Sequence, residues 1–246
     1  MEDLAQTSAG QTRLRRLFSL SGVVPLGAFL LLHLWTAAAL LSSNATYDRQ
    51  VAVLHGGPVV GLLAIALVLV PLAFHGVYGT WLAFQPRPAQ HAYGSGLMLA
   101  LQRISGLVVL LFVVAHLRAT LVPAWRGQLL VGSYSTRLVA DLSTLDSGIP
   151  WTALGYLVGM AATVFHLATG MTSFGIARGL VRGPVAERRS RFFFRAIGIG
   201  VFAIGAATIL ALATGTRFLG EEAPPAPGAC GAAASPSPSA LPGAAH

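Results

Sequence analysis

The sequence predicts an all-α membrane protein with a bundle of five transmembrane helices. The chain is 54% hydrophobic and only 10% charged, whereas a soluble protein carries about 25% charged residues. It also contains five apolar runs close to the roughly 20 residues that a helix needs to cross the hydrocarbon core of a bilayer. A charged fraction this low cannot cover a surface that faces water. We therefore expect most of the surface to face lipid.

The apolar runs cover residues 22–41, 59–84, 104–122, 151–176 and 196–214. Pro71 lies inside the second run and predicts a kink, because proline interrupts the helical hydrogen bonds. Residues 1–21 are expected to form a cytoplasmic N-terminal segment without a cleavable signal peptide, and residues 22–219 the five-helix domain. Residues 220–246 are rich in Pro, Ala and Ser and predict a disordered tail. The connection 123–150 predicts a short amphipathic helix along the membrane surface.

The basic residues indicate how the chain crosses the membrane. All 16 are arginines. The N-terminal segment and the second and fourth connections hold eleven of them, and the other side holds five. Because cytoplasmic loops carry the excess of basic residues, we expect the N-terminus in the cytoplasm and the C-terminus outside a bacterial-type inner membrane. This distribution explains the net charge of +8 without nucleic-acid binding.

Four of the apolar runs contain one histidine each, namely His33, His75, His116 and His166. Polar side chains in the hydrocarbon region are costly and are usually functional. One such histidine is equally well explained by a hydrogen bond between helices, but four on four helices weaken that explanation. None of the five runs contains Asp, Glu or Lys, whereas ion and proton transporters usually pair histidines with intramembrane acids.

The depths of the histidines predict two layers. At 1.5 Å per residue, His33 and His116 lie about 10–14 Å from the outer boundary, and His75 and His166 about 24–26 Å from it. Two facing imidazoles suit the axial ligation of a haem within a helix bundle, whereas zinc requires three or four ligands. The sequence therefore predicts two stacked haems, roughly 10–15 Å apart along the membrane normal, that conduct electrons across the membrane.

Small and polar residues near the histidines are candidates for the haem surroundings. Gly27, Gly76 and Gly170 leave room for a flat macrocycle, although glycine is also common where membrane helices touch. The hydroxyls of Ser21 and Ser105 and the charge of Arg103 are candidate partners for haem propionates. The predicted haem surroundings are therefore Ser21, Gly27, Gly76, Arg103, Ser105 and Gly170.

Four segments together carry a family resemblance. They are SLSG before His33, PLAFHGVYG around His75, QRISG before His116 and VFHLATGM around His166. In this order and spacing, over about residues 13–219, the chain resembles the five-helix dihaem cytochrome b subunits of succinate:quinone oxidoreductases. The resemblance implies a non-flavin electron-transfer subunit that anchors a flavoprotein subunit and an iron–sulfur subunit on the cytoplasmic side of the bilayer.

The resemblance also implies an electron path. Electrons from succinate would reach the inner haem, held by His75 and His166, then the outer haem, held by His33 and His116, and finally a quinone. In dihaem relatives the quinone is commonly menaquinone near the outer haem. The arginine-rich segment 178–195 has two possible roles, which can hold at once. It sets the topology by the positive-inside rule, and it suits docking of the peripheral subunits or of anionic lipid headgroups.

Quinone reduction also needs a proton relay, and a histidine suits that role because its pKa lies near 7. His55, in VLHGGP before the second run, is expected at the outer mouth, with Arg49 upstream. We hypothesise that His55 and Arg49 line the quinone site. The competing explanation is that His55 lies in a loop and meets only solvent.

Three alternatives to a succinate dehydrogenase subunit stay open. The first is a fumarate reductase subunit that works in the reverse direction. Some fumarate-reducing relatives carry an acid just before the fourth histidine, whereas Val164 lies two residues before His166, which favours succinate oxidation. The second is the cytochrome b subunit of another membrane oxidoreductase or a haem-free anchor. The third is a transporter that uses intramembrane histidines.

Overall fold

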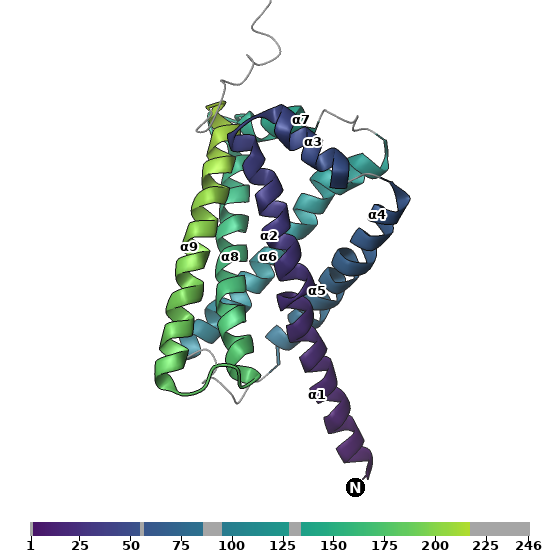
Figure 1. Ribbon diagram of the computed structural model, residues 1–246, viewed down its shortest axis with the longest axis vertical. Helices are drawn as coiled ribbons and strands as arrows, with labels where there is room; N and C mark the ends of the chain where they lie inside the picture. The colour runs from purple at the N-terminus through teal and green to yellow at the C-terminus, as the bar shows by residue number, and fades with distance from the viewer. Residues whose placement is uncertain (1, 55–56, 86–94, 128–133, 217–246) are drawn as a thin grey trace, which may run out of the picture.

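The computed structural model describes residues 2–54, 57–85, 95–127 and 134–216, with side chains from residue 10 onward. Long helices pack side by side, and two short helices lie across one end of the bundle (Figure 1). The helical elements are α1 Glu2–Val23, α2 Pro25–Ala38, η1 Ala39–Leu41, α3 Asn44–Leu54, α4 Pro58–Ala64, η2 Ile65–Leu69, α5 Val70–Ala83, α6 Gly96–Trp125, α7 Tyr134–Ser143, α8 Trp151–Ala177 and α9 Pro184–Thr214.

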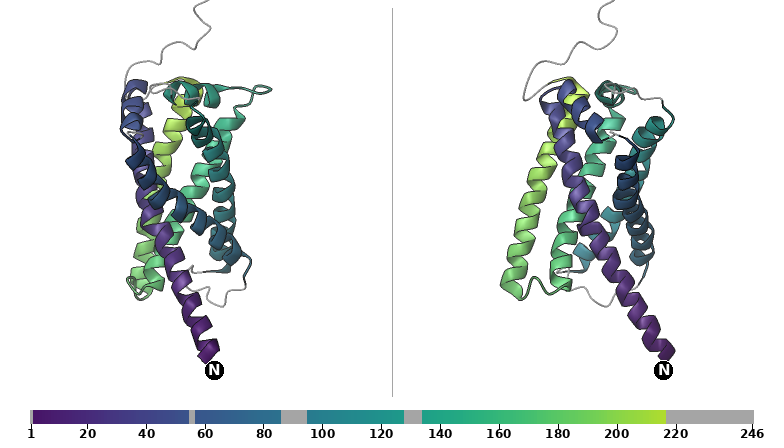
Figure 2. Two further views of the ribbon diagram at one scale, coloured as in Figure 1. Left: turned by 90° about the vertical axis from the view of Figure 1, so that its right-hand side faces the viewer. Right: turned by 45° about the vertical axis from the view of Figure 1, so that its right-hand side comes forward.

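Within the residues that the structure describes, five helical stretches are long and apolar enough to cross a membrane, which confirms the predicted all-α bundle. They are Gly10–Leu41, Pro58–Ala83, Gly96–Trp125, Trp151–Ala177 and Pro184–Thr214. The first stretch starts earlier than expected, because α1 is already helical in the polar segment and continues into α2 at Pro25. The N-terminal part of α1 projects beyond the other helices in every view (Figure 2).

The surface and the interior have the pattern of a protein in lipid. Large apolar side chains such as Val77, Leu111 and Ile199 are more than 70% exposed. By contrast, the buried residues include polar ones, among them Gln102 and Ser105. A bilayer accepts apolar side chains on the outside, and polar groups then gather between the helices where they find hydrogen-bond partners.

The kink predicted at Pro71 takes the form of a wide helical turn. The segment η2 directly before it is π-helical, and the N–H of Val70 donates to the carbonyl of Ile65, five residues earlier. Proline lacks an N–H and its ring collides with the carbonyl four residues before it. The wider turn displaces that carbonyl, so the span Pro58–Ala83 passes the proline without ending.

Helices α3 and α7 cover the end of the bundle opposite the N-terminus, which we call the α3–α7 end (Figure 1). The Asp48 carboxylate on α3 accepts hydrogen bonds from the Ser135 N–H at 3.0 Å and the Ser135 hydroxyl at 2.7 Å. Ser135 on α7 is only 1% exposed. The short amphipathic helix predicted between residues 123 and 150 is confirmed as α7, whereas α3 is an addition to the prediction.

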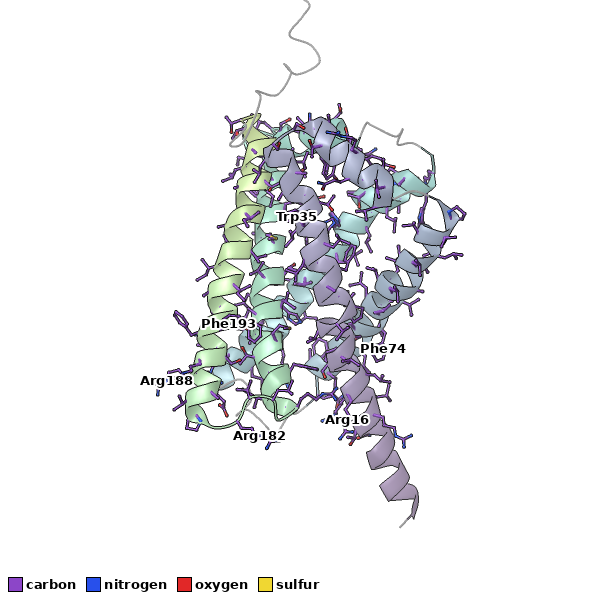
Figure 3. The ribbon with its side chains drawn as sticks, in the orientation of Figure 1. Arg16, Trp35, Phe74, Arg182, Arg188 and Phe193 are labelled. Atoms are coloured by element: carbon purple, nitrogen blue, oxygen red, sulfur yellow. The ribbon has the colours of Figure 1, made fainter. Side chains whose placement is uncertain are left out.

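Arginines mark the other end. Arg16, Arg182 and Arg188 lie there together (Figure 3), while Trp35 and Phe193 are exposed on the sides of the bundle. The Arg178 side chain donates from Nη2 to the Arg16 carbonyl at 2.9 Å and so ties α8 to α1. We call this the arginine end.

Candidate functional site

The four intramembrane histidines form two pairs. His75 on α5 and His166 on α8 have ring centroids 6.3 Å apart, with an angle of 88° between the ring planes. His33 on α2 and His116 on α6 have ring centroids 5.7 Å apart, with an angle of 76°. The structure thus brings together the same two pairs that the depth count predicts.

The spacing of each pair leaves room for one metal ion between the rings. A bond from an imidazole nitrogen to a transition metal such as zinc is about 2.0–2.1 Å long, so two rings on opposite sides of one metal have centroids about 6 Å apart. Within the segments that the structure describes, no group of three or more His, Cys, Asp or Glu residues is arranged to hold a metal. Each pair thus supplies two imidazoles, which is the number that the predicted axial ligation of a haem requires.

In the inner pair, the Nδ1 atoms of the two histidines have matching hydrogen-bond partners. His75 Nδ1 lies 3.1 Å from the Phe18 carbonyl and 3.3 Å from the Ser21 hydroxyl. His166 Nδ1 lies 3.2 Å from the Gln102 carbonyl and 3.3 Å from the Ser105 hydroxyl. A carbonyl can only accept, so Nδ1 carries the hydrogen in both rings. The lone pair then resides on Nε2, which is the nitrogen left to bind a metal.

A glycine follows each of these serines and lets the ring approach the helix. A Cβ atom on Gly22 would collide with the His75 ring, and one on Gly106 would lie 2.9 Å from His166 Cε1. We call residues 18–22 and 102–106 the two serine–glycine clamps. Ser21 and Ser105 were predicted as propionate partners, and the structure places their hydroxyls on the histidines. Gly22 was not in the predicted set, although the Ser-Gly dipeptide recurs in SLSG and QRISG.

The outer pair has different supports. His116 Nδ1 lies 3.1 Å from the Tyr156 hydroxyl on α8. Phe29 stacks near His33 with ring centroids 5.5 Å apart, and Phe112 near His116 with centroids 5.7 Å apart. Sequence reasoning missed the Tyr156 contact, because Tyr156 and His116 are 40 residues apart in the chain. It also missed Phe29 and Phe112, although each precedes its histidine by four residues, the spacing of neighbours on one helix face.

The other predicted glycines lie against neighbouring helices. A Cβ on Gly27 would meet Leu167 at 3.8 Å, one on Gly76 would meet Leu110 at 3.1 Å, and one on Gly170 would meet Gln102 Nε2 at 3.6 Å. These positions are close helix contacts, the ordinary use of glycine in membranes. Their role in the haem surroundings stays a prediction.

Arg103 has a free buried donor near the inner pair. Its Nη2 donates to the Gln85 carbonyl at 2.9 Å, while its Nε is buried without a hydrogen-bond partner. A buried donor of a charged group without a partner is costly. An anionic group such as a haem propionate would satisfy it, so Arg103 fits its predicted role.

Of the two residues predicted for the quinone site, the structure describes only Arg49. Arg49 is exposed on α3, and its Nε donates to the Ala45 carbonyl of the same helix at 3.4 Å. His55 lies outside the described residues. A cavity of about 290 Å³ at the same end has a separate lining, made by Ala119, Leu138, Asp141, Leu142, Thr144, Thr152 and Tyr156.

Comparison with known proteins gives one informative similarity. The chain is 28% identical over 199 residues to the succinate dehydrogenase cytochrome b558 subunit of Bacillus subtilis (strain 168), which covers 80% of this chain and 95% of that protein. The chain is a homologue of a succinate dehydrogenase cytochrome b subunit. The resemblance stated from the four histidine segments is thereby confirmed.

No family model and no solved structure matches the chain. The similarity to the cytochrome b subunit extends over nearly the whole length of that relative, so it includes the spanning helices and not one motif alone. The two histidine pairs, and the clamps of the inner pair, are the features of this chain that suit such a cytochrome.

Proposed function

We propose that the chain is the membrane-anchor cytochrome b subunit of a succinate dehydrogenase and passes electrons through two b haems to a quinone. The observation that carries the proposal is the arrangement of four intramembrane histidines in two pairs, each spaced for one metal between the rings. The similarity to a succinate dehydrogenase cytochrome b subunit supports this function over the alternatives.

The residues that would hold the inner haem are His75 and His166, and those for the outer haem are His33 and His116. Haem supplies reversible one-electron transfer when bound. The chain itself fixes the protonated nitrogen of both inner rings, since the Nδ1 of His75 and of His166 donates to a backbone carbonyl and leaves Nε2 as the nitrogen that would bind the metal. The surrounding apolar helices exclude water from both pairs.

The arginine end is the side where the flavoprotein and iron–sulfur subunits would bind. The positive-inside rule favours the cytoplasm for this end, and exposed arginines such as Arg182, Arg188 and Arg189 offer charges to acidic partner surfaces. The inner pair is the pair nearer to this end by residue count. Electrons would therefore enter at His75 and His166 and leave past His33 and His116.

The α8–α9 contact supports succinate oxidation over fumarate reduction. Val164 is 8% exposed, and a Cβ on Gly198 of α9 would lie 3.1 Å from the Val164 side chain. Where some fumarate-reducing relatives use an acid, this chain has an apolar side chain in a tight helix contact. A proton path through this part of α8 has no titratable group here to carry it.

The test is to purify a tagged chain from membranes with its partners and to add succinate. We expect a flavoprotein and an iron–sulfur protein to co-purify, and the absorbance of reduced b haem to rise after succinate is added. If the chain co-purifies with other redox partners and its haem is not reduced by succinate, it belongs to a different membrane oxidoreductase. A chain that co-purifies with no redox partner would contradict the proposal.

A further inference from the structure

A small polar pocket lies at the arginine end, between the start of α6, the end of α8 and the start of α9. Its volume of about 10 Å³ is enough for about one oxygen atom the size of that of water. Thr169, Thr172 and Ser173 line it from α8, and Arg191 and Arg195 line it from α9. Thr172 and Ser173 are buried, so the pocket belongs to the packed bundle and not to a loop.

The donors best placed for a ligand belong to the two arginines. The hydroxyls of Thr172 and Ser173 already donate to carbonyls of α8 itself. In the described part of the chain, Arg191 Nη1 is buried and has no hydrogen-bond partner. Arg195 Nη2 donates to the Met98 sulfur at 3.7 Å, and a thioether is a weak acceptor. Two guanidinium groups with poorly satisfied N–H groups favour an anion with oxygen atoms at its surface.

The charges at the pocket set the charge of that anion. The Glu187 carboxylate pairs with Arg191 Nη2 at 2.9 Å, whereas the described residues give Arg195 no carboxylate partner. The two arginines and Glu187 together carry one positive charge in excess. The single negative charge of a phosphodiester would balance it, and its oxygens accept hydrogen bonds from guanidinium groups in the geometry that arginine favours.

The depth of the pocket indicates where such a phosphodiester comes from. Arg195 is the last charged residue before the apolar run 196–214, which lies in a membrane-spanning helix. Phe192 and Ile199 lie three residues before and four after it on the same side of α9, and both are more than 70% exposed. This face of α9 therefore meets lipid at the level where the hydrocarbon begins and the headgroups lie. Basic pockets between membrane helices on the cytoplasmic side suit anionic lipid headgroups.

We propose that this pocket binds the phosphodiester of an anionic phospholipid and that Arg191 and Arg195 donate to its oxygens. One phosphate oxygen enters the pocket and accepts from Arg191 Nη1. Another accepts from Arg195 and replaces its contact with Met98. The acyl chains lie along the exposed apolar face of α9. The proposal does not depend on the proposed function, since it involves neither the histidine pairs nor an electron carrier.

The test measures the binding of phosphatidylglycerol to the full-length chain in detergent by native mass spectrometry. Arg191→Gln combined with Arg195→Gln should raise the dissociation constant about tenfold or more, because two charge-assisted hydrogen bonds are lost. Arg188→Gln combined with Arg189→Gln is the matched control, since it removes the same charge from exposed positions of the same helix, outside the pocket lining. It should change the constant less than about twofold, because water and salt screen these exposed charges.

A second variant distinguishes a lost site from a misfolded chain. Glutamate is similar to methionine in length, so Met98→Glu places a carboxylate within reach of Arg195. This carboxylate takes the place of the phosphate and neutralises the excess charge. Met98→Glu should therefore weaken the binding of phosphatidylglycerol and raise the melting temperature of the lipid-free chain, whereas a misfolded variant would melt earlier. Met98→Gln, which adds no charge, should keep the binding.

Three outcomes would overturn the proposal. The first is equal binding in wild type and in the variant of Arg191 and Arg195. The second is an equal loss in the control variant of Arg188 and Arg189, because the lipid would then recognise the surface charge and not the pocket. The third is displacement of phosphatidylglycerol by inorganic phosphate at the same concentration, because the pocket would then take the free anion and not the lipid.

Discussion

At the scale of single residues, the serine–glycine clamps determine how the inner histidines are oriented. Each clamp supplies a carbonyl and a hydroxyl to Nδ1 and a glycine against the ring edge. The hydrogen bonds fix which nitrogen is protonated, and the missing side chain lets the ring lie against the neighbouring helix. Together the two features leave Nε2 as the nitrogen without the proton and seat the ring against its clamp.

A methyl group in a clamp should therefore disable the inner pair alone. Gly22→Ala places a Cβ in the His75 ring, and Gly106→Ala places one 2.9 Å from His166 Cε1. We expect either variant to lose the spectral component of the inner haem and to keep that of the outer haem. Reduced-minus-oxidised difference spectra measure both.

Gly200→Ala is the control for this prediction, because a Cβ there has no atom within 4 Å. It should keep both haem components. If Gly22→Ala and Gly106→Ala also kept both, with unchanged band positions, the clamps would have no part in holding the inner histidines.

Tyr47 on α3 gives a pH-dependent prediction. Burial, with a smaller effect of the Asp48 charge, raises the pKa of Tyr47 from 10.0 to about 12. In the unfolded chain the phenol ionises near pH 10, whereas in the folded chain it stays protonated to about pH 12. The folded state therefore loses stability as the pH rises from 10 towards 12, since only the unfolded state gains by ionisation. In Tyr47→Phe the melting temperature in detergent should fall less over this range than in wild type. Equal falls in both proteins would contradict the shift.

At the scale of the elements, the contact between α3 and α7 holds the cover of the α3–α7 end in place. Two donors of Ser135 are satisfied by one carboxylate that lies 87 residues earlier in the chain. Helix α7 also packs Leu138, Val139 and Leu142 against the core cluster. The cover is thus attached by an apolar face and by one buried polar connection.

Removal of the carboxylate should cost more than removal of the hydroxyl. Asp48→Ala leaves two buried donors without a partner, which we expect to destabilise the protein by about 1–3 kcal/mol. Ser135→Ala keeps the N–H bond and should cost about 1 kcal/mol. Thermal unfolding in detergent, followed by tryptophan fluorescence, gives the order of the two effects. The reverse order, or no effect of Asp48→Ala, would show that the connection does not stabilise the cover.

The elements differ in how far the sequence predicts them. The spans follow from length and hydropathy, and α7 follows from its alternating apolar and polar faces. Helix α3 was missed because its segment, NATYDRQVAVL, is short and mixes polar with apolar residues. A signal did exist, since the Ser43 hydroxyl accepts the N–H of Thr46 at the start of the helix, and serine is a preferred residue at that position.

At the scale of the whole molecule, the pairing of the histidines was predictable while their supports were not. Depth along a helix follows from residue counts, so the two layers could be derived from the positions of four residues. The contacts of Tyr156 with His116 and of Ser105 with His166 depend on how the helices rotate about their axes. The same holds for the cavity beside Asp141, which forms only when α6, α7 and α8 come together.

The arginine end gives a prediction about assembly. Arg188 and Arg189 are exposed, and the ion pair of Arg191 with Glu187 at 2.9 Å lies beside them. Replacement of Arg188, Arg189, Arg191 and Arg195 by Gln should release the peripheral subunits from membranes at moderate salt. Succinate dehydrogenase activity of the soluble fraction against that of the membrane fraction measures the release.

Two controls accompany this assembly test. Insertion of the variant is checked by protease access to the loops, and replacement of the single exposed Arg49 on α3 should leave attachment unchanged. Full retention of the peripheral subunits by the correctly inserted variant would contradict docking at this segment.

The central claim is that the two histidine pairs are two haem sites, and a dithionite-reduced minus oxidised spectrum with haem quantified per polypeptide tests it most directly. The account predicts two b haems per chain. It also predicts that His33→Ala and His116→Ala remove one component, and that His75→Ala and His166→Ala remove the other. A well-folded wild-type chain without haem, or the loss of one shared component in His33→Ala and His75→Ala, would contradict it.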